Sequence, residues 1–237
     1  MIRQNYYDNY LERTVEQNTK GSHPMICTRI KICGITSPED ARLTVSLGAD
    51  YLGLIFTESP RRVTVDTAQK IRKAVPSALL VGVFKDDPLD DVAKICNSGV
   101  ISIVQLHGTE TPEYCGELMS RSHLPIIKTV SESQLDDADR MRDYRTTSFF
   151  LFDLDKPSGN GAGPRTNGNR ERLWSEAAKV RRKGYRIFLA GALDASNVHD
   201  AVHQVKPYCV DVASGVEKYP GVKDRAALER FMAQVKR

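Results

Sequence analysis

The chain has 237 residues, 41% of them hydrophobic and 27% charged, which is ordinary for a globular protein and excludes a wholly disordered chain. Its 34 basic and 30 acidic residues leave a net charge of +4 without a basic stripe, so we expect no nucleic-acid partner. The apolar runs are shorter than the roughly 18 residues of a membrane span, and the first residues lack the apolar core of a signal peptide, so we expect a cytoplasmic protein with no membrane partner.

Strand and helix signals alternate along the chain after a polar start. Residues 1–27 are mostly polar and end in a Gly-Ser-His-Pro break, which predicts an N-terminal extension with no catalytic role. Residues 37–40 then combine a cap residue, a proline and two acidic residues, as the first turn of a helix does. Similar signals recur at 87–99, from 111 and over 194–205. The strands are expected at 28–33, 50–56, 79–84, 101–106, 124–129, 148–153, 186–190 and 208–212.

Eight strand–helix units in a row predict an α/β fold, a single-domain (β/α)8 or TIM barrel over residues 28–237. Parallel strands need helical crossovers, and closure of the barrel removes both sheet edges. A doubly wound open sheet is the structural alternative, but no G-x-G-x-x-G follows the first strand and the number of units fits a barrel better. In such a barrel the active site lies at the carboxyl ends of the strands.

Polar and small residues follow several of these strand ends. A thiol ends the first strand, arginines follow the second, a carboxylate ends the sixth, and small-residue turns follow the seventh and eighth. Each has an ordinary structural explanation, such as a buried thiol, a carboxylate bound to loop backbone, or a solvated arginine. Their convergence on one end of a barrel favours a site. The candidates are Cys33, Arg61, Gln105, His107, Asp153, Gly191, Ala192, Asp211, Ser214 and Gly215.

The cysteines predict neither a disulfide framework nor a metal site. There are five, an odd number with wide spacing and no C-x-x-C pair: Cys27, Cys33, Cys96, Cys115 and Cys209. By contrast, Gly191-Ala192 and Ser214-Gly215 are suited to anion binding, because small residues let backbone N–H groups approach a phosphate. A tight turn that needs glycine for its geometry alone is the alternative explanation.

The strand-end motifs together resemble the phosphoribosylanthranilate isomerase family of tryptophan biosynthesis. The resemblance covers residues 28–237, and its motifs occur in the family's order. They are KICGIT at 31–36, GADYLGLIF at 48–56, SPR at 59–61, VGVF at 81–84, VQLHG at 104–108, FDLD at 152–155, LAGAL at 189–193 and VDVASGVE at 210–217.

The resemblance implies an Amadori rearrangement of N-(5'-phosphoribosyl)anthranilate to 1-(2-carboxyphenylamino)-1-deoxyribulose 5-phosphate, without metal or cofactor. Cys33 would be the general base and Asp153 the general acid, with the thiol pKa drawn down by positive charge and the carboxyl pKa raised. Arg61 would bind the anthranilate carboxylate. The phosphate pocket would be formed by Gly191, Ala192, Ser214 and Gly215, with Gln105, His107 and Asp211 lining the site. The partner would be this small phosphorylated substrate, and the chain a monomer or a homodimer.

Three departures from the family's pattern keep other functions open. The stretch SGNGAGPRTNGNRERLW at 158–174 is longer and more basic than usual and could be a lid or a relaxed loop, AGAL replaces GGL, and Ala213 replaces a serine. A non-catalytic relative that binds phosphorylated metabolites is therefore one alternative, although both Cys33 and Asp153 are present. The related indole-glycerol-phosphate synthase would need a catalytic lysine, and the two-substrate isomerase of histidine biosynthesis an aspartate in place of Cys33.

Overall fold

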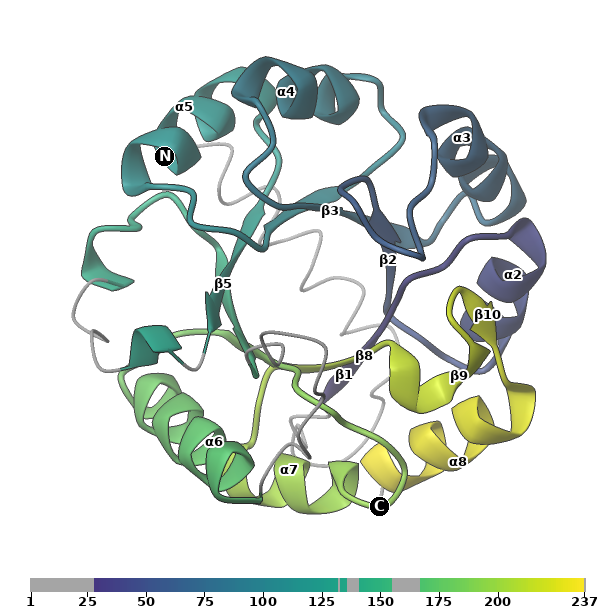
Figure 1. Cartoon of the computed structure of the whole chain (residues 1–237), viewed down its shortest axis with the longest axis vertical. Helices are drawn as coiled ribbons and strands as arrows, with labels where there is room; N and C mark the ends of the chain where they lie inside the picture. The colour runs from purple at the N-terminus through teal and green to yellow at the C-terminus, as the bar shows by residue number, and fades with distance from the viewer. Residues whose placement is uncertain (1–27, 132, 136–140, 155–166, 237) are drawn as a thin grey trace, which may run out of the picture.

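Eight parallel strands form a closed barrel in the computed structural model, which describes residues 28–131, 133–135, 141–154 and 167–236. Each strand pairs with the next in chain order, and β8 pairs with β1 to close the ring, which Figure 1 shows end-on. The predicted barrel is thus confirmed and the open sheet is wrong. The strands are β1 (Arg29–Cys33), β2 (Tyr51–Ile55), β3 (Leu79–Phe84), β4 (Ile103–Leu106), β5 (Ile126–Ser131), β6 (Phe149–Asp153), β7 (Ile187–Leu189) and β8 (Cys209–Val212).

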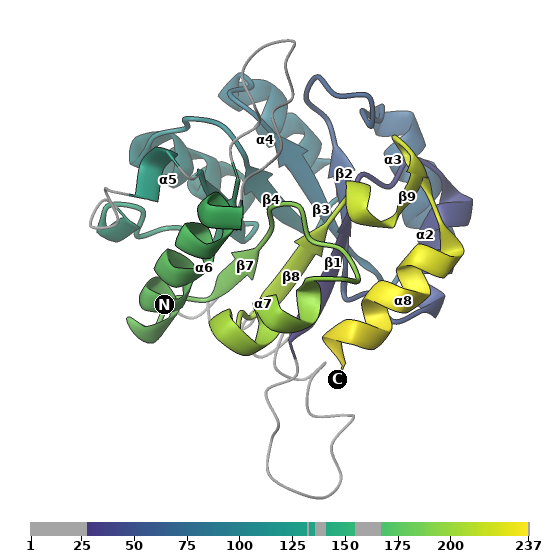
Figure 2. The same cartoon turned by 60° about the horizontal axis from the view of Figure 1, so that its bottom comes forward.

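Helices surround the barrel, and several of them begin at a capping side chain. Ser37 accepts a hydrogen bond from the backbone N–H of Asp40 at 3.1 Å. Thr111 accepts from the backbone N–H of Tyr114 in the same way, at the start of the helix signalled from residue 111. Neighbouring helices lie side by side on the outside of the strands (Figures 1 and 2). They are α2 (Pro38–Ser46), α3 (Val65–Ala74), α4 (Leu89–Asn97), α5 (Pro112–Ser122), α6 (Asn167–Arg182), α7 (Val198–Val205) and α8 (Arg225–Val235).

Some expected boundaries differ from the structure. The helix expected from Asp194 begins at Val198, because the Asp194 carboxylate accepts from Ser196 and Asn197 bonds the backbone on both sides of the turn. The stretch expected as a loop at 158–174 is α6 from Asn167 onward, and its earlier residues, like the extension 1–27, lie outside the described residues. A 3-10 turn, η2 (Ser214–Val216), and a short hairpin of β9 (Glu217–Tyr219) and β10 (Val222–Lys223) follow β8.

Side chains alternate along each strand between the barrel interior and the layer under the helices. Ile30, Ile32, Leu52 and Leu54 belong to the large cluster that packs against the helices. A second cluster fills the interior, where Tyr51 and Phe149, the first residues of β2 and β6, both contact the ring of Phe188 on β7. The interior is therefore packed at its amino-terminal end, and polar side chains occupy the strands' carboxyl-terminal halves. Among the described residues no helix is both long and apolar enough to cross a membrane.

Candidate active site

Cys33 is the last residue of β1, and its side chain lies against the backbone of β2. It is 8% exposed, and Gly53 is its partner in the parallel register. The backbone N–H groups of Gly34 and Ile35 both donate to the carbonyl of Gly53 at 3.0 Å, which fixes the turn that follows the cysteine. Gly34 has φ 75°, and a Cβ on it would stand 2.6 Å from Cδ of Arg61. The turn after the cysteine therefore requires glycine both for its backbone conformation and for the packing of Arg61.

A buried ion pair lies two residues before the cysteine. Nζ of Lys31, which is fully buried, donates to Oδ2 of Asp211 at 2.6 Å, and Asp211 itself is 7% exposed. Lys31 and Asp211 face each other in the register of β1 and β8. Burial lowers the pKa of Lys31, but the charge and hydrogen bond of Asp211, together with Cys33 and Cys209, raise it by more in sum, so the ammonium stays charged. The site thus contains a buried positive charge on the same face of β1 as Cys33.

The thiol pKa differs from the expectation drawn from the sequence. Burial raises the pKa of the Cys33 thiol, Lys31 lowers it, Asp211 raises it, and Lys223 lowers it, with a net value above the ordinary 9.0. The expected lowering is therefore wrong for the protein alone, because desolvation of the thiolate outweighs the two ammonium groups. The positive groups are nevertheless in place and act in the expected direction.

Arg61 lies beside the cysteine turn and is held by a carboxylate from the end of the barrel. Its Nε and Nη2 both donate to Glu217, the Nη2 bond being 2.6 Å long, so that the pair is two-pronged. Glu217 also accepts from Nζ of Lys223 at 2.9 Å, and Lys223 donates to the carbonyl of Cys33 at 2.6 Å. Within the described part of the chain, Nη1 of Arg61 is left without a hydrogen bond. This network connects the ends of β1, β2 and β8.

Asp153 ends β6 and lies next to His107, which follows β4. Its Oδ1 accepts from the backbone N–H of Leu154 at 2.8 Å, and its Oδ2 lies 3.5 Å from Nε2 of His107. The other ring nitrogen of His107 lies 3.0 Å from Nε2 of Gln105 and 3.2 Å from Oγ1 of Thr129. Since the amide nitrogen can only donate, Nδ1 accepts and the ring proton lies on Nε2, facing Asp153. The carboxylate is 27% exposed and therefore accessible.

The two small-residue turns lie against each other. A Cβ on Gly215 would stand 2.1 Å from the carbonyl oxygen of Leu193, which no backbone adjustment could accommodate cheaply. Gly191 has φ 94° and Ala192 has φ 52°, so both occupy the left-handed region. The loops after β7 and β8 thus form one tightly packed unit with glycine at the point of contact.

The structure brings the sequence candidates together in four groups. The first group is Cys33 with Arg61, and the second is Asp153 with His107 and Gln105. In the third group Asp211 pairs with Lys31, and in the fourth Gly215 packs on the turn after β7. Four further residues of the site were not predicted from the sequence: Lys31, Gly53, Glu217 and Lys223. A lysine inside an apolar strand, as in RIKIC, signals a buried partner, whereas the partners of Glu217 depend on a hairpin too short to recognise. Among the described residues no group of three or more His, Cys, Asp and Glu side chains could hold a metal ion.

A closed barrel whose parallel strands end in a buried thiol, an accessible carboxylate and several cationic groups is typical of (β/α)8-barrel enzymes that use acid–base chemistry. The model of the N-(5'-phosphoribosyl)anthranilate isomerase family matches residues 30–234. The isomerase of Geobacter sp. strain M21 is 40% identical over 212 residues, which are 89% of this chain and 98% of that protein. The chain therefore belongs to the N-(5'-phosphoribosyl)anthranilate isomerase family.

Solved structures agree with this family. Monomers of the dimeric phosphoribosylanthranilate isomerase from Thermotoga maritima match with a TM-score of 0.74 and 32% identity, over 88% of this chain and 98% of that one. A phosphoribosylanthranilate isomerase in complex with reduced 1-(o-carboxyphenylamino)-1-deoxyribulose 5-phosphate matches with a TM-score of 0.75, 32% identity and the same coverage. The chain is thus an isomerase of tryptophan biosynthesis by sequence and by fold.

Proposed function

We propose that this isomerase rearranges N-(5'-phosphoribosyl)anthranilate with Cys33 as the general base and Asp153 as the general acid. The observation that carries the proposal is the position of these two residues, which end β1 and β6 of one parallel barrel and so lie at the same end of it. Asp153 is accessible, and Cys33 lies beside positive groups that favour its thiolate. A carboxyl group and a thiol are residue types that can give and take a proton, and both lie where a substrate at this end of the barrel could reach them.

The reaction proceeds by two proton transfers. Protonated Asp153 donates to the ring oxygen of the furanose, the ring opens, and an iminium ion forms. The thiolate of Cys33 removes the proton from C2', which gives an enolamine that tautomerises to the ketone. His107 contacts the carboxylate at 3.5 Å and orients it, while Gln105 and Thr129 orient His107.

The substrate's two anionic ends are bound at different places. Arg61, held by Glu217 on two nitrogens, presents Nη1 to the anthranilate carboxylate. Backbone N–H groups of the two packed turns bind the phosphate. The solved relative with a carboxyphenylamino deoxyribulose phosphate bound carries the same two anionic groups in its ligand, which supports this assignment. The residues at the phosphate are Gly191, Ala192, Ser214 and Gly215, and Gln105, His107 and Asp211 line the space between the two ends.

The catalytic domain in this proposal is the single barrel of residues 28–237, with residues 1–27 as an extension that takes no part in the chemistry. The family match begins at residue 30, which supports this boundary. A biosynthetic enzyme works where its phosphorylated substrate is made, so the proposed location is the cytoplasm. The dimeric relative from Thermotoga maritima makes a homodimer as reasonable as a monomer, and size-exclusion chromatography decides between them.

Turnover of freshly generated N-(5'-phosphoribosyl)anthranilate tests the activity. The substrate fluoresces, so its consumption is followed continuously, and chromatography against the authentic ketose identifies the product. Loss of fluorescence with formation of that product is the expected result. Binding of a reduced product analogue without any turnover would show instead a non-catalytic relative that binds phosphorylated metabolites.

A further inference from the structure

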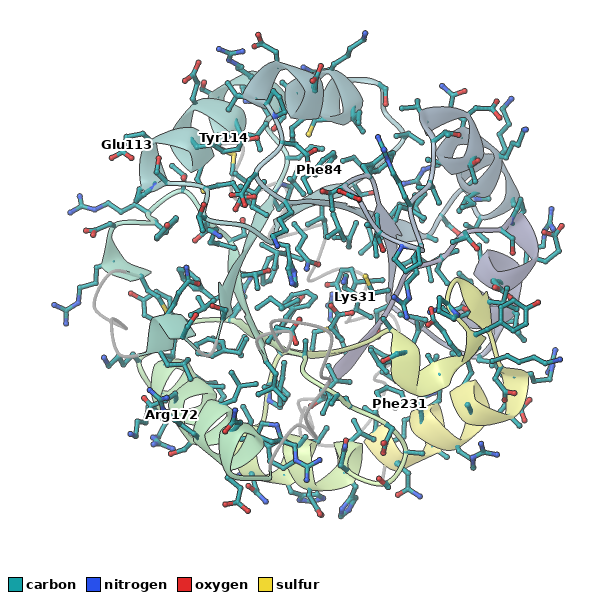
Figure 3. All side chains as sticks on the ribbon, in the orientation of Figure 1. Lys31, Phe84, Glu113, Tyr114, Arg172 and Phe231 are labelled. Carbon is teal, nitrogen blue, oxygen red and sulfur yellow. The ribbon has the colours of Figure 1, made fainter. Side chains whose placement is uncertain are left out.

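Lys31 carries a full charge into the interior of the barrel, where Figure 3 shows it inside the ring of strands. Its side chain has no exposed surface, donates a hydrogen bond to Asp211, and lies within hydrogen-bonding reach of the Cys33 thiol. Burying an ammonium group costs several kcal/mol unless its geometry and partners are very good. An apolar residue would pack at this position without that cost, so the charge calls for an explanation beyond stability.

We propose that Lys31 is a positioning residue that controls the ionisation of Cys33, and that Asp211 holds its ammonium group in place for this purpose. The inference rests on the proposed role of Cys33 as the general base. In addition, it identifies Lys31 as the group that stabilises the thiolate of this base.

The geometry of the three residues supports this role. Lys31 and Cys33 are two residues apart on β1, so their side chains leave the same face of the strand. An ammonium group has three protons, and Asp211 takes one of them, which leaves two for the sulfur. Oδ1 of Asp211 is buried and has no hydrogen-bond partner among the described residues, so Lys31 is the principal group that balances this carboxylate.

The other charged groups around the thiol are already committed to Glu217. Lys223 donates to Glu217 and to two backbone carbonyls, and Arg61 uses two of its nitrogens on the same carboxylate. Their positive charge is thus shared between the sulfur and Glu217. The charged groups that face Cys33 are therefore Lys31 from β1, Asp211 from β8, Lys223 from β10, and Arg61 from the loop after β2.

Ionisation of the thiol is a simple proton release. The S–H bond breaks, the electron pair stays on sulfur, and the proton leaves to solvent, while Lys31 keeps its three protons. The ammonium group stabilises the thiolate, and the charge of Asp211 opposes it. Loss of the Lys31 charge must therefore lower the thiolate fraction, whether Lys31 is replaced or the Asp211 charge that keeps it protonated is removed, and loss of a buried ion pair elsewhere in the barrel would not do so.

Alkylation of Cys33 by iodoacetamide measures its thiolate directly. The rate is followed as a function of pH by mass spectrometry of the peptide that contains Cys33, so the remaining cysteines do not interfere. The variants are Lys31→Met and Asp211→Asn. The matched control is Lys128→Met, which breaks the comparable buried pair with Glu110 (Nζ to Oε2, 3.0 Å) on another strand.

We expect Lys31→Met to slow alkylation about tenfold or more at about pH 8, because one pKa unit is a tenfold change in thiolate below the pKa. Asp211→Asn should slow it as well, because the buried ammonium group loses the carboxylate that keeps it protonated, and Lys128→Met should leave it unchanged. Lys31→Met should also lower kcat more than it changes KM. If Lys31→Met does not fold, the double variant Lys31→Met/Asp211→Asn, which leaves no unpaired charge, should be alkylated more slowly than the wild type, because Lys31 acts on the thiol more strongly than Asp211 does.

The inference is overturned if the alkylation profile of Lys31→Met, or of the double variant, matches that of the wild type. Alkylation requires no substrate, so this outcome is distinct from failure of the proposed function, in which the wild type does not turn over the substrate at all. An active wild type with an unchanged Lys31→Met profile contradicts the role of Lys31 alone.

Discussion

The Cα of Gly53 faces the thiol of Cys33 so closely that a Cβ at residue 53 would stand 2.6 Å from Sγ. It would also stand 2.9 Å from Cα of Cys33, so a rotation of the thiol alone would not make room. The missing side chain on β2 therefore provides the space in which the proposed base sits. This glycine is needed for close approach of two strands, and its φ is not in the left-handed region.

Gly53→Ala is expected to displace the thiol and to lower kcat about a hundredfold, the effect of misplacing a reacting group by roughly 1 Å. Overpacking should also cost about 1–3 kcal/mol of stability. Gly82→Ala on β3 is the control, because its Cβ would meet Cδ1 of Ile101 at 2.7 Å. It should lose similar stability in urea and keep its kcat. Wild-type kcat in Gly53→Ala would contradict the tight fit.

Ala192→Gly is expected to stabilise the protein. Ala192 has φ 52°, and a left-handed conformation costs a residue with a side chain about 1 kcal/mol. The substitution removes this cost, but the greater freedom of glycine in the unfolded chain cancels about half of the benefit. The free energy of unfolding is therefore expected to rise by about 0.5 kcal/mol. Ala190→Gly, two residues earlier and outside the left-handed region, should destabilise. Urea unfolding of both variants measures the difference, and equal signs would argue against strain at Ala192.

Glu217 should make stability depend on pH in acid. Burial raises the pKa of Glu217, but the hydrogen bonds and charges of Arg61 and Lys223 together lower it by more, so the net pKa lies below the ordinary 4.5. The ionised Glu217 therefore contributes its full share to the free energy of unfolding above pH 4.5. That share is lost as the pH falls through the lower pKa of the folded state. Glu217→Gln should cost about 3 kcal/mol at neutral pH, because it leaves two cations without their carboxylate.

The difference between Glu217→Gln and the wild type should shrink in urea titrations carried below pH 4.5. Glu229→Gln removes an exposed pair with Arg225 on α8 and serves as the control, with an expected effect below about 0.5 kcal/mol. If the difference in free energy of unfolding between Glu217→Gln and the wild type stays the same below pH 4.5, the charge of the carboxylate is not what stabilises the network.

Removal of residues 1–27 is expected to leave turnover unchanged. The barrel is closed by β1 and β8, which lie entirely within the described residues, and every proposed catalytic and binding residue comes after residue 28. The measurement is kcat/KM of a chain that begins at Thr28, beside the full chain. A loss of more than about tenfold would give the extension a part in the chemistry or in binding.

The barrel could be predicted from the sequence because its strands are separate apolar runs divided by helix caps. The hairpin of β9 and β10 could not, since strands of three and two residues are too short for a periodic pattern. The strand-end candidates could also be predicted, because parallel strands bring their carboxyl ends to the same end of a barrel. The pairing of Lys31 with Asp211 depends on closure between the first and last strands, and 180 residues separate the partners.

The thiol pKa could not be predicted for a related reason. Positive charge near Cys33 was expected and is present, but the extent of burial is set by the packing of Gly53 and Arg61 around the strand end. A sequence shows which groups can lower a pKa, whereas the desolvation that opposes them is a property of the folded barrel.

The most direct test of the central claim is turnover of N-(5'-phosphoribosyl)anthranilate by the wild type beside Cys33→Ser and Asp153→Asn. General acid–base groups contribute about 10²–10⁴-fold, so each variant should lose at least two orders of magnitude in kcat while it still binds a reduced product analogue. Turnover by either variant within tenfold of the wild type would contradict the assignment of that residue as the acid or the base.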